Sequence, residues 1–234
     1  PFTPGNQILH GNVVRDYFDN LLPDSEGIRR RLAMRYQADS LEPFDLLKEL
    51  GKDCVGAIQL LSDEEEPTDL YSVKYRPLSE SEIASTLRNT TEALLPGRHV
   101  DNDDLRLSIA GAQEKTALLW HDGSWCLPLG HTPTTHIFKL PLGLVGNMKA
   151  DMSTSVENEW LCSLLLEQYG VPVAKTRIAQ FEDQKALVVE RFDRRWSGDQ
   201  QWIIRLPQED MCQALAVSPL RKYQADGGPG ISDI

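Results

Sequence analysis

The sequence predicts an α+β fold, with helices in its first part and mainly strands after a polar stretch from Asn89 to Asp104. Two observations support this prediction. Apolar residues recur at helical spacing between Asn12 and Leu50, and short apolar runs divided by turn residues follow Asp104. With 234 residues, 41% of them hydrophobic and 25% charged, the chain has the composition of a folded globular protein.

The first part is expected to contain helices and one strand. Pro23 ends the first apolar stripe, and Asp24 or Ser25 follows in a position to cap the next helix. Ser79 and Glu82 have the spacing of a capping box, in which each side chain accepts a hydrogen bond from the other residue's backbone N–H. A continuous apolar run over residues 55–61 is typical of a buried strand. The expected helices cover residues 12–22, 25–36, 43–50 and 79–87.

The second part is expected to form strands with a long helix among them. Asp122-Gly123 between apolar runs is a strong hairpin signal. Thr154 and Glu157 have capping-box spacing, and Gly170 is placed to end the helix that they begin. Residues 143–153 are interpreted as a loop and residues 208–215 as a further helix. The expected strands cover residues 105–110, 116–120, 125–127, 136–140, 171–179, 186–192 and 202–206.

The net charge of −11 opposes direct binding to nucleic acid, which needs a basic surface to displace counterions. Arg29-Arg30-Arg31 is one candidate for a local basic patch, although a solvated helix face is the favoured interpretation. Arg191, Arg194 and Arg195 form a second candidate patch. The four cysteines have no partners at metal-ligand spacing, so we expect reduced cysteines and no structural metal. No apolar run approaches the roughly 20 residues that a membrane helix needs.

The segment from Ser108 to Lys115 carries the strongest chemical signal in the chain. It lies between two apolar runs and is expected to form a strand, a tight turn and a second strand. Gly111, flanked by alanines, leaves the turn backbone uncovered, so that its N–H groups can approach an anion. Lys115 closes the turn with a positive charge, and Lys139 lies in a later strand. Together these residues predict a phosphate clamp over a nucleotide, although Ala-Gly-Ala alone also fits a plain turn.

The order of these features is that of the N-terminal lobe of a protein kinase. A glycine turn comes first, then a lysine in a strand, then a helix with acidic residues near its start, then two more strands. Glu157 or Glu159 is expected to orient Lys139, and the alternative for Glu157 is a capping role alone. The strand end at residues 190–192 is expected to offer backbone groups to adenine, and Asp193 to accept a hydrogen bond from a ribose hydroxyl.

Five segments of the chain carry a family resemblance that covers nearly the whole sequence. They are Phe18 to Ser25, Ser108 to Leu118, Thr132 to Pro141, Val189 to Trp196 and Leu206 to Gln213. These segments resemble the HipA family, and the motifs are long and specific. The resemblance implies a kinase-like fold with an additional N-terminal subdomain, and a serine/threonine kinase that uses ATP and Mg²⁺.

The resemblance also implies a biological setting. The family's kinases are toxins of type II toxin–antitoxin pairs, whose partner is a small helix-turn-helix antitoxin of the HipB type that binds operator DNA. The implied protein substrate is an aminoacyl-tRNA synthetase, whose phosphorylation in the cytoplasm favours dormancy and persistence. Ser108 matches the serine that such kinases phosphorylate on themselves. The predicted ATP-binding residues are Ala110, Gly111, Ala112, Gln113, Glu114, Lys115, Lys139, Glu190, Arg191, Phe192 and Asp193.

Phosphorylation of Ser108 has a predicted consequence. A phosphate adds about −1.5 to −2 charge at neutral pH, next to the turn that must hold the phosphates of ATP. It would compete for the N–H groups of that turn and repel the nucleotide. Phosphorylated Ser108 is therefore hypothesised to be an inactive state.

The sequence departs from the family where catalysis takes place. Phosphoryl transfer needs a catalytic Asp, a nearby Asn and a metal-holding Asp. No segment matches the Gly-x-x-Asp-x-His-x-x-Asn-type loop of the family, so catalytic and metal-binding residues are expected beyond Ile234. The chain is expected to be a portion of a longer kinase and inactive alone, with a partial N-terminal subdomain over residues 1–100, an N-lobe over 101–192 and the start of a C-lobe over 193–234.

Two other classes of function stay open. The chain fits a noncatalytic module of the same fold that binds an antitoxin or another protein. It also fits a related kinase that phosphorylates a lipid or a small molecule.

Overall fold

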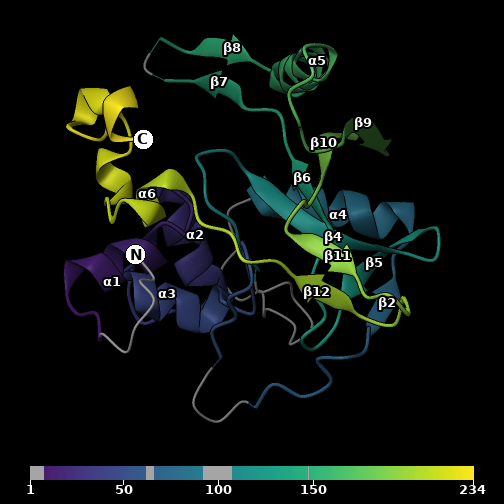
Figure 1. Ribbon diagram of the computed structural model, residues 1–234. Coiled ribbons are helices and arrows are strands. Elements are labelled where there is room, and N and C mark those ends of the chain that lie inside the picture. Colours follow the sequence, from purple (N-terminus) through teal and green to yellow (C-terminus); the bar gives the residue numbers. More distant parts are fainter. Residues whose placement is uncertain (1–7, 62–65, 92–106, 147) are drawn as a thin grey trace. The chain divides into compact units, whose positions relative to one another are not determined.

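The computed structural model describes residues 8–61, 66–91, 107–146 and 148–234. Its elements form a mixed α and β structure (Figure 1), as the sequence predicts. The chain separates into two compact units, the first formed by Pro1–Glu66, Arg106–Ala112 and Leu206–Ile234, the second by Pro67–Leu105 and Gln113–Arg205. This grouping differs from the expected domain limits at residues 100 and 192, which stay predictions.

The first unit is mainly helical. Its N-terminal helices are α1 (Asn12–Asp19), α2 (Glu26–Tyr36) and α3 (Pro43–Leu50), close to the expected ranges. Ser25 caps α2, because its hydroxyl accepts a hydrogen bond from the Ile28 N–H at 3.4 Å. Leu22, Leu47 and Leu50 are fully buried in the core that these helices enclose.

The remaining elements of the first unit come from distant parts of the sequence. Strand β1 (Asp53–Cys54) pairs in parallel with β3 (Leu107–Ser108), and helix α6 (Met211–Ala214) packs against α1. Three short 3-10 helices follow, η1 (Pro219–Arg221), η2 (Gln224–Asp226) and η3 (Ile231–Asp233). Asp210 and Gln213 form a capping box at the start of α6.

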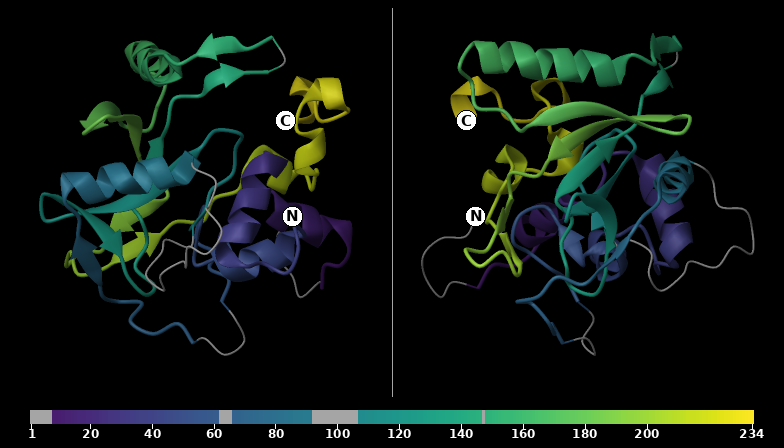
Figure 2. Two further views of the ribbon diagram at one scale, coloured as in Figure 1. Left: turned by 180° about the vertical axis from the view of Figure 1, so that it is seen from behind. Right: turned by 90° about the vertical axis from the view of Figure 1, so that its right-hand side faces the viewer.

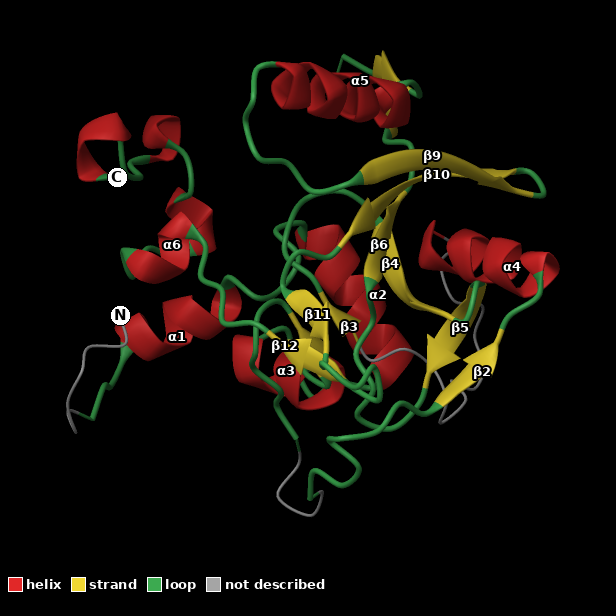
Figure 3. Cartoon of the chain, turned by 45° about the vertical axis from the view of Figure 1, so that its right-hand side comes forward, coloured by secondary structure: helices red, strands yellow, loops and turns green. Residues whose placement is uncertain are grey.

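The second unit is built on a six-stranded antiparallel sheet with the order β2-β5-β4-β6-β10-β9 (Figure 3). Asp122 and Gly123 join β4 to β5 with φ angles of 48° and 73°, the left-handed conformations of a tight hairpin turn. The predicted hairpin is therefore confirmed. The strands are β2 (Tyr75–Pro77), β4 (Lys115–His121), β5 (Ser124–Pro128), β6 (His136–Lys139), β9 (Thr176–Phe181) and β10 (Gln184–Glu190).

Two helices accompany this sheet (Figure 2). Helix α4 (Glu80–Thr91) covers one face, where Ile83 and Leu87 pack with the fully buried Phe138. The predicted capping box at its start is confirmed, since Ser79 N–H donates to Glu82 at 2.8 Å and Glu82 N–H donates to Ser79 at 3.3 Å. Helix α5 (Ser155–Gln168) packs against β9 and β10.

Several local predictions were wrong. Residues 143–153 are not a loop but contain the antiparallel pair β7 (Gly143–Val145) and β8 (Ala150–Met152). Residues 55–61 form no strand, because the short strand β1 precedes that apolar run. The strand expected over 202–206 is present as β12 (Ile203–Arg205), but it pairs with an unexpected strand, β11 (Arg194–Trp196), in an antiparallel hairpin. Strand β9 begins later than expected, at Thr176.

The apolar side chains along α5 are largely uncovered. Val156 in its first turn is fully buried, whereas Leu164 and Leu165 are 36% and 50% exposed. The buried residues of this helix, Ser155 and Val156, both lie in its first turn.

Gly228 is expected to be intolerant of any side chain. A Cβ atom at this position would lie 1.9 Å from the Arg221 carbonyl oxygen and 2.9 Å from that of Tyr223, both rigid backbone atoms. We expect Gly228→Ala to lower the free energy of unfolding by about 2 kcal/mol or more, as for other overpacked sites. The matched control is Gly27→Ala in helix α2, where the nearest atom would be 3.6 Å away and alanine is favoured by up to about 1 kcal/mol. Urea denaturation of both variants measures the difference, and equal stabilities would contradict this assignment.

Candidate nucleotide-binding site

Lysines gather at one end of the sheet in the second unit. Lys115 on β4 lies directly opposite Lys139 on β6, and Lys139 lies directly opposite Leu187 on β10. Directly opposite residues share a face of the sheet and alternate residues along a strand return to it, so Lys185 lies on this face as well. The neighbouring Phe138 points the other way, into the core beneath α4. This face therefore concentrates positive charge at one end.

Lys139 forms an ion pair with Glu159 of helix α5. The sequence left Glu157 and Glu159 open as partners of this lysine, and the geometry selects Glu159. The lysine comes from an interior strand, so both its position and its direction are fixed by the sheet. The two side chains are 26% and 37% exposed, so neither member of the pair is fully buried.

Glu157 has a different partner. It forms an ion pair with Lys185 on β10, and the hydrogen bond from that lysine lowers the pKa of the Glu157 carboxyl below its usual value. Thr154 makes no side-chain hydrogen bond at the start of α5, so the capping box predicted for Thr154 and Glu157 is wrong. The Glu157 carboxylate instead connects helix α5 to strand β10, and Glu159, two residues later, connects the same helix to strand β6.

The segment predicted to meet adenine begins at Glu190, the last residue of β10. The backbone N–H of Glu190 donates to the Lys175 carbonyl at 2.9 Å, and that of Arg191 donates to the Thr135 carbonyl at 2.9 Å. Phe192 is 69% exposed. Two N–H groups of this segment are therefore used within the protein, whereas the side chains of Glu190 and Phe192 are exposed.

Asp193 lies in a buried network of charges. Its carboxylate accepts hydrogen bonds from Arg191 at 3.0 and 2.7 Å and from Arg194 at 3.0 Å, and Arg191 also donates to Thr134 at 2.9 Å. The side chains of all three charged residues are at most 5% exposed. Arg191 and Arg194 are therefore not part of a basic surface patch. A ribose contact by Asp193 stays a prediction and would compete with these arginines.

The glycine turn is divided between the units. Ser108 is fully buried in the first unit, where its hydroxyl donates to the Leu21 carbonyl at 2.8 Å. Gly111 has a φ of 114°, which favours glycine, and forms a parallel bridge with Pro23. The expected strand–turn–strand hairpin is wrong, because β3 pairs with β1 rather than with β4.

The residues after the turn belong to the second unit. The Leu140 N–H donates to the Glu114 carbonyl at 3.1 Å, and the Gln113 side chain donates to the Leu140 carbonyl at 2.5 Å. These bonds continue the pairing of β4 with β6 up to Lys115 and Lys139. Ala110, Gly111 and Ala112 lie in the first unit.

The part of the chain that the structure describes offers no group of three or more His, Cys, Asp or Glu side chains suited to hold a metal ion. Cys54, Cys126, Cys162 and Cys212 are all free thiols, in line with the predicted reduced cysteines. No described helix combines the length and apolar character needed to cross a membrane.

His136 is expected to make folding depend on pH. Burial lowers its pKa from 6.5 to about 4, the nearby Arg177 acting in the same direction and Glu190 against it. Between those values the unfolded chain binds a proton that the folded protein excludes, so stability falls as pH drops from 7 through this range. Urea midpoints at pH 7 and pH 5 should therefore differ more for the natural protein than for His136→Gln. Parallel behaviour of the two proteins would contradict this role.

Two well-placed residues escape the sequence interpretation. The first is Lys185, which pairs with Glu157. The alternation of β10, together with the two glutamates at Glu157 and Glu159, is the sequence signal for this second ion pair between helix and sheet. Arg29 is predicted to lie on a solvated helix face, yet its side chain is only 13% exposed and pairs with Asp19 at 2.5 Å. No local pattern reveals this burial, because Asp19 lies on the preceding helix.

The chain matches two protein families. Residues 107–234 match the HipA-like C-terminal domain, and residues 2–61 match the HipA N-terminal domain. Y4mE of Sinorhizobium fredii, named as a candidate kinase, is 37% identical over 223 residues, which is 94% of this chain and 50% of that protein. The serine/threonine-protein kinase toxin HipA of Shewanella oneidensis is 30% identical over 224 residues, 94% of this chain and 47% of the toxin.

A solved structure is similar as well. In the complex of HipA, HipB and operator DNA from Shewanella oneidensis MR-1, the matched chain has a TM-score of 0.68 and 29% identity, covering 95% of this chain and 48% of its own length. The chain therefore spans about half the length of the relatives it matches.

Proposed function

Because this chain belongs to the HipA family, we propose that it forms the ATP-binding part of a serine/threonine protein kinase. The chain spans about half the length of the relatives it matches, so the proposal concerns a kinase that contains these residues. Its relatives include a kinase toxin, so the proposed biological role is that of the toxin in a toxin–antitoxin pair.

The ion pair between Lys139 and Glu159 is the observation that supports this proposal best. In protein kinases a strand lysine binds the α- and β-phosphates of ATP, and a glutamate on the following helix holds that lysine in place. Lys115, directly opposite Lys139, adds positive charge on the same face. Hydrogen bonds to charged groups contribute about 1.5–3 kcal/mol each, so a few such contacts suffice to retain a nucleotide.

The other ATP contacts are proposed from the family motifs. Ala110 to Lys115 offer backbone N–H groups and a lysine to the phosphates, and Glu190 to Phe192 offer backbone groups to adenine. Asp193 is proposed for the ribose. ATP supplies the transferable phosphoryl group, and the residues of this chain bind and orient it.

The described residues include no group of three or more His, Cys, Asp or Glu side chains that could hold a metal ion. We therefore assign Mg²⁺ no ligand in this part of the chain. The catalytic Asp, its Asn and the metal-holding Asp are proposed to lie after Ile234.

The partners are proposed from the relatives. The similar solved structure is a complex of HipA with HipB and operator DNA. We expect a helix-turn-helix antitoxin to bind the protein that contains this chain, with DNA contacted through the antitoxin. The proposed substrate is an aminoacyl-tRNA synthetase, and the proposed location is the cytoplasm.

Labelled ATP tests the proposed function against its alternatives. The polypeptide as its gene encodes it is incubated with γ-labelled ATP, Mg²⁺ and a cell extract, and label is followed in proteins and in small molecules. Label in serine or threonine of a protein supports the kinase, and label in a lipid or metabolite supports the related small-molecule kinase instead. Absence of ATP binding, together with tight binding of a cognate antitoxin, would support the noncatalytic module.

A further inference from the structure

The segment from Asp19 to Asp24, here called the docking turn, holds the predicted phosphate-binding segment inside the first unit. The Leu21 carbonyl accepts the hydroxyl hydrogen bond of Ser108 at 2.8 Å. Pro23 forms a parallel bridge with Gly111, and the Asp24 N–H donates to the Gly111 carbonyl at 3.2 Å. The backbone from Ser108 to Gly111 thus follows the docking turn along its length.

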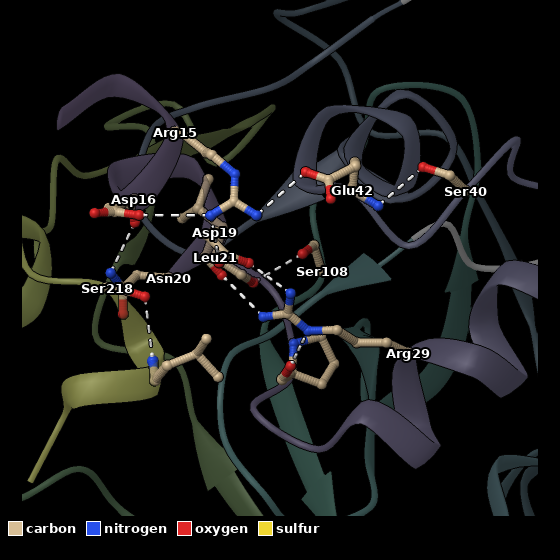
Figure 4. Close-up of polar contacts among 12 residues, drawn as sticks. Arg15, Asp16, Asp19, Asn20, Leu21, Arg29, Ser40, Glu42, Ser108 and Ser218 are labelled. Atoms are coloured by element: carbon tan, nitrogen blue, oxygen red, sulfur yellow. Dashed lines mark hydrogen bonds and ion pairs between the residues drawn. The ribbon is translucent and has the colours of Figure 1, made fainter. Parts of the chain in front are cut away.

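Arg29 in turn holds the docking turn (Figure 4). Its guanidinium donates through Nη1 to the Asp19 carboxylate at 2.5 Å, through Nη2 to the Asp19 carbonyl at 3.3 Å and through Nε to the Pro23 carbonyl at 2.6 Å. The Arg29 and Asp19 side chains are only 13% and 6% exposed. Hydrogen bonds to a charged group that water barely reaches are strong, and a planar guanidinium fixes the relative positions of its acceptors.

The docking turn needs such a brace because it is irregular backbone between two helices. Asn20 fixes its first part, donating to the Asp16 and Val217 carbonyls at 2.8 Å each. Lys222 pairs with Asp24 at its other end at 3.0 Å. Arg29 bonds Asp19 at the first end of the turn and Pro23 next to its last residue, and therefore sets the distance between them.

We propose that Arg29 is a positioning residue for the nucleotide. Arg29 acts, through the docking turn, on the segment from Ser108 to Gly111, called the glycine segment below. This inference rests on the proposed function, in which the Gly111 turn binds the phosphates of ATP. Without Arg29 the carbonyls of Asp19 and Pro23 lose a shared donor, and the docking turn relaxes. Gly111 then loses its fixed partner, so ATP must order the segment when it binds and its affinity falls.

The test compares Arg29→Ala with Arg30→Ala by calorimetric titration of ATP and of adenosine. Arg30 is the matched control, because it follows on the same helix, is 66% exposed and forms its ion pair with Glu26 of that helix at 2.6 Å. We expect Arg29→Ala to weaken ATP binding by about tenfold, the range of ordinary coupling energies, and to leave adenosine affinity within about twofold. Arg30→Ala should change neither. Equal losses for ATP and adenosine, or no loss, would overturn the proposal.

A second variant and a second readout cover the case in which Arg29→Ala does not fold. Arg29→Lys keeps the charge beside Asp19 but cannot reach Asp19 and Pro23 in the same planar geometry. We expect its backbone amides from Ser108 to Ala112 to exchange hydrogen faster than those of the natural protein, with unchanged exchange in α3. Unchanged exchange at the glycine segment would refute the positioning role. This readout needs no nucleotide, so failure of the natural protein to bind ATP would refute the proposed function without deciding the role of Arg29.

Discussion

Replacing Lys139 by alanine is expected to abolish most of the thermal stabilisation that the proposed ATP binding gives to the protein. Lys139 is the strand lysine that Glu159 orients, so its loss removes a charge that the phosphates would meet directly. A ligand at about 100 times its Kd stabilises a folded protein by about 2.7 kcal/mol, which sets the size of the effect at stake. Differential scanning fluorimetry with and without ATP measures it.

Lys185→Ala is the matched control for this experiment. Lys185 lies on the neighbouring strand, on the same face, and has its own glutamate on α5, Glu157. Its removal takes away the same charge and one ion pair but keeps the pair of Lys139 with Glu159, so most of the ATP effect should survive. An unchanged thermal shift in Lys139→Ala would remove Lys139 from the site.

Glu159→Gln should weaken ATP binding more than Glu157→Gln does.

Phosphorylation of Ser108 is expected to weaken ATP binding by at least about tenfold, through release of the glycine segment. The hydroxyl is fully buried and donates its hydrogen to the Leu21 carbonyl. A phosphate dianion has no hydrogen to donate to that carbonyl and is larger than the hydroxyl it replaces. It also brings about two negative charges into a place without water. The segment from Ser108 to Gly111 must then leave the docking turn, together with the N–H groups proposed for ATP.

Ser108→Ala separates the effect of the phosphate from the loss of the hydroxyl. Alanine removes one buried hydrogen bond, at a cost of about 1 kcal/mol in unfolding free energy, but adds no charge and no volume. Its ATP affinity should stay within a few-fold of the natural protein, on the order of one hydrogen bond. Nucleotide titration of the phosphorylated protein, the Ser108→Ala variant and the natural protein gives the comparison. Undiminished affinity after phosphorylation would contradict the hypothesis of an inactive state.

The candidate site was partly predictable, because some of its residues belong to elements that follow one another in the sequence. A lysine in a strand and acidic residues at the next helix start were enough to predict an ion pair with Lys139. The choice of Glu159 was not predictable, because it depends on how α5 lies against β10, where Lys185 takes Glu157. The burial of Asp193 between Arg191 and Arg194 was not predictable either, because a run of charged residues in a sequence is equally typical of a surface turn.

The sequence by itself determined the mixed fold, the first three helices, the α4 capping box and the Asp122-Gly123 hairpin. Each of these depends on interactions within a few residues, which composition and spacing reveal. Tertiary structure alone decided that β3 pairs with β1 in the first unit and that Arg29 braces the docking turn. Parallel pairing and buried ion pairs join residues that no local pattern connects, because their energy appears only when distant segments are packed together.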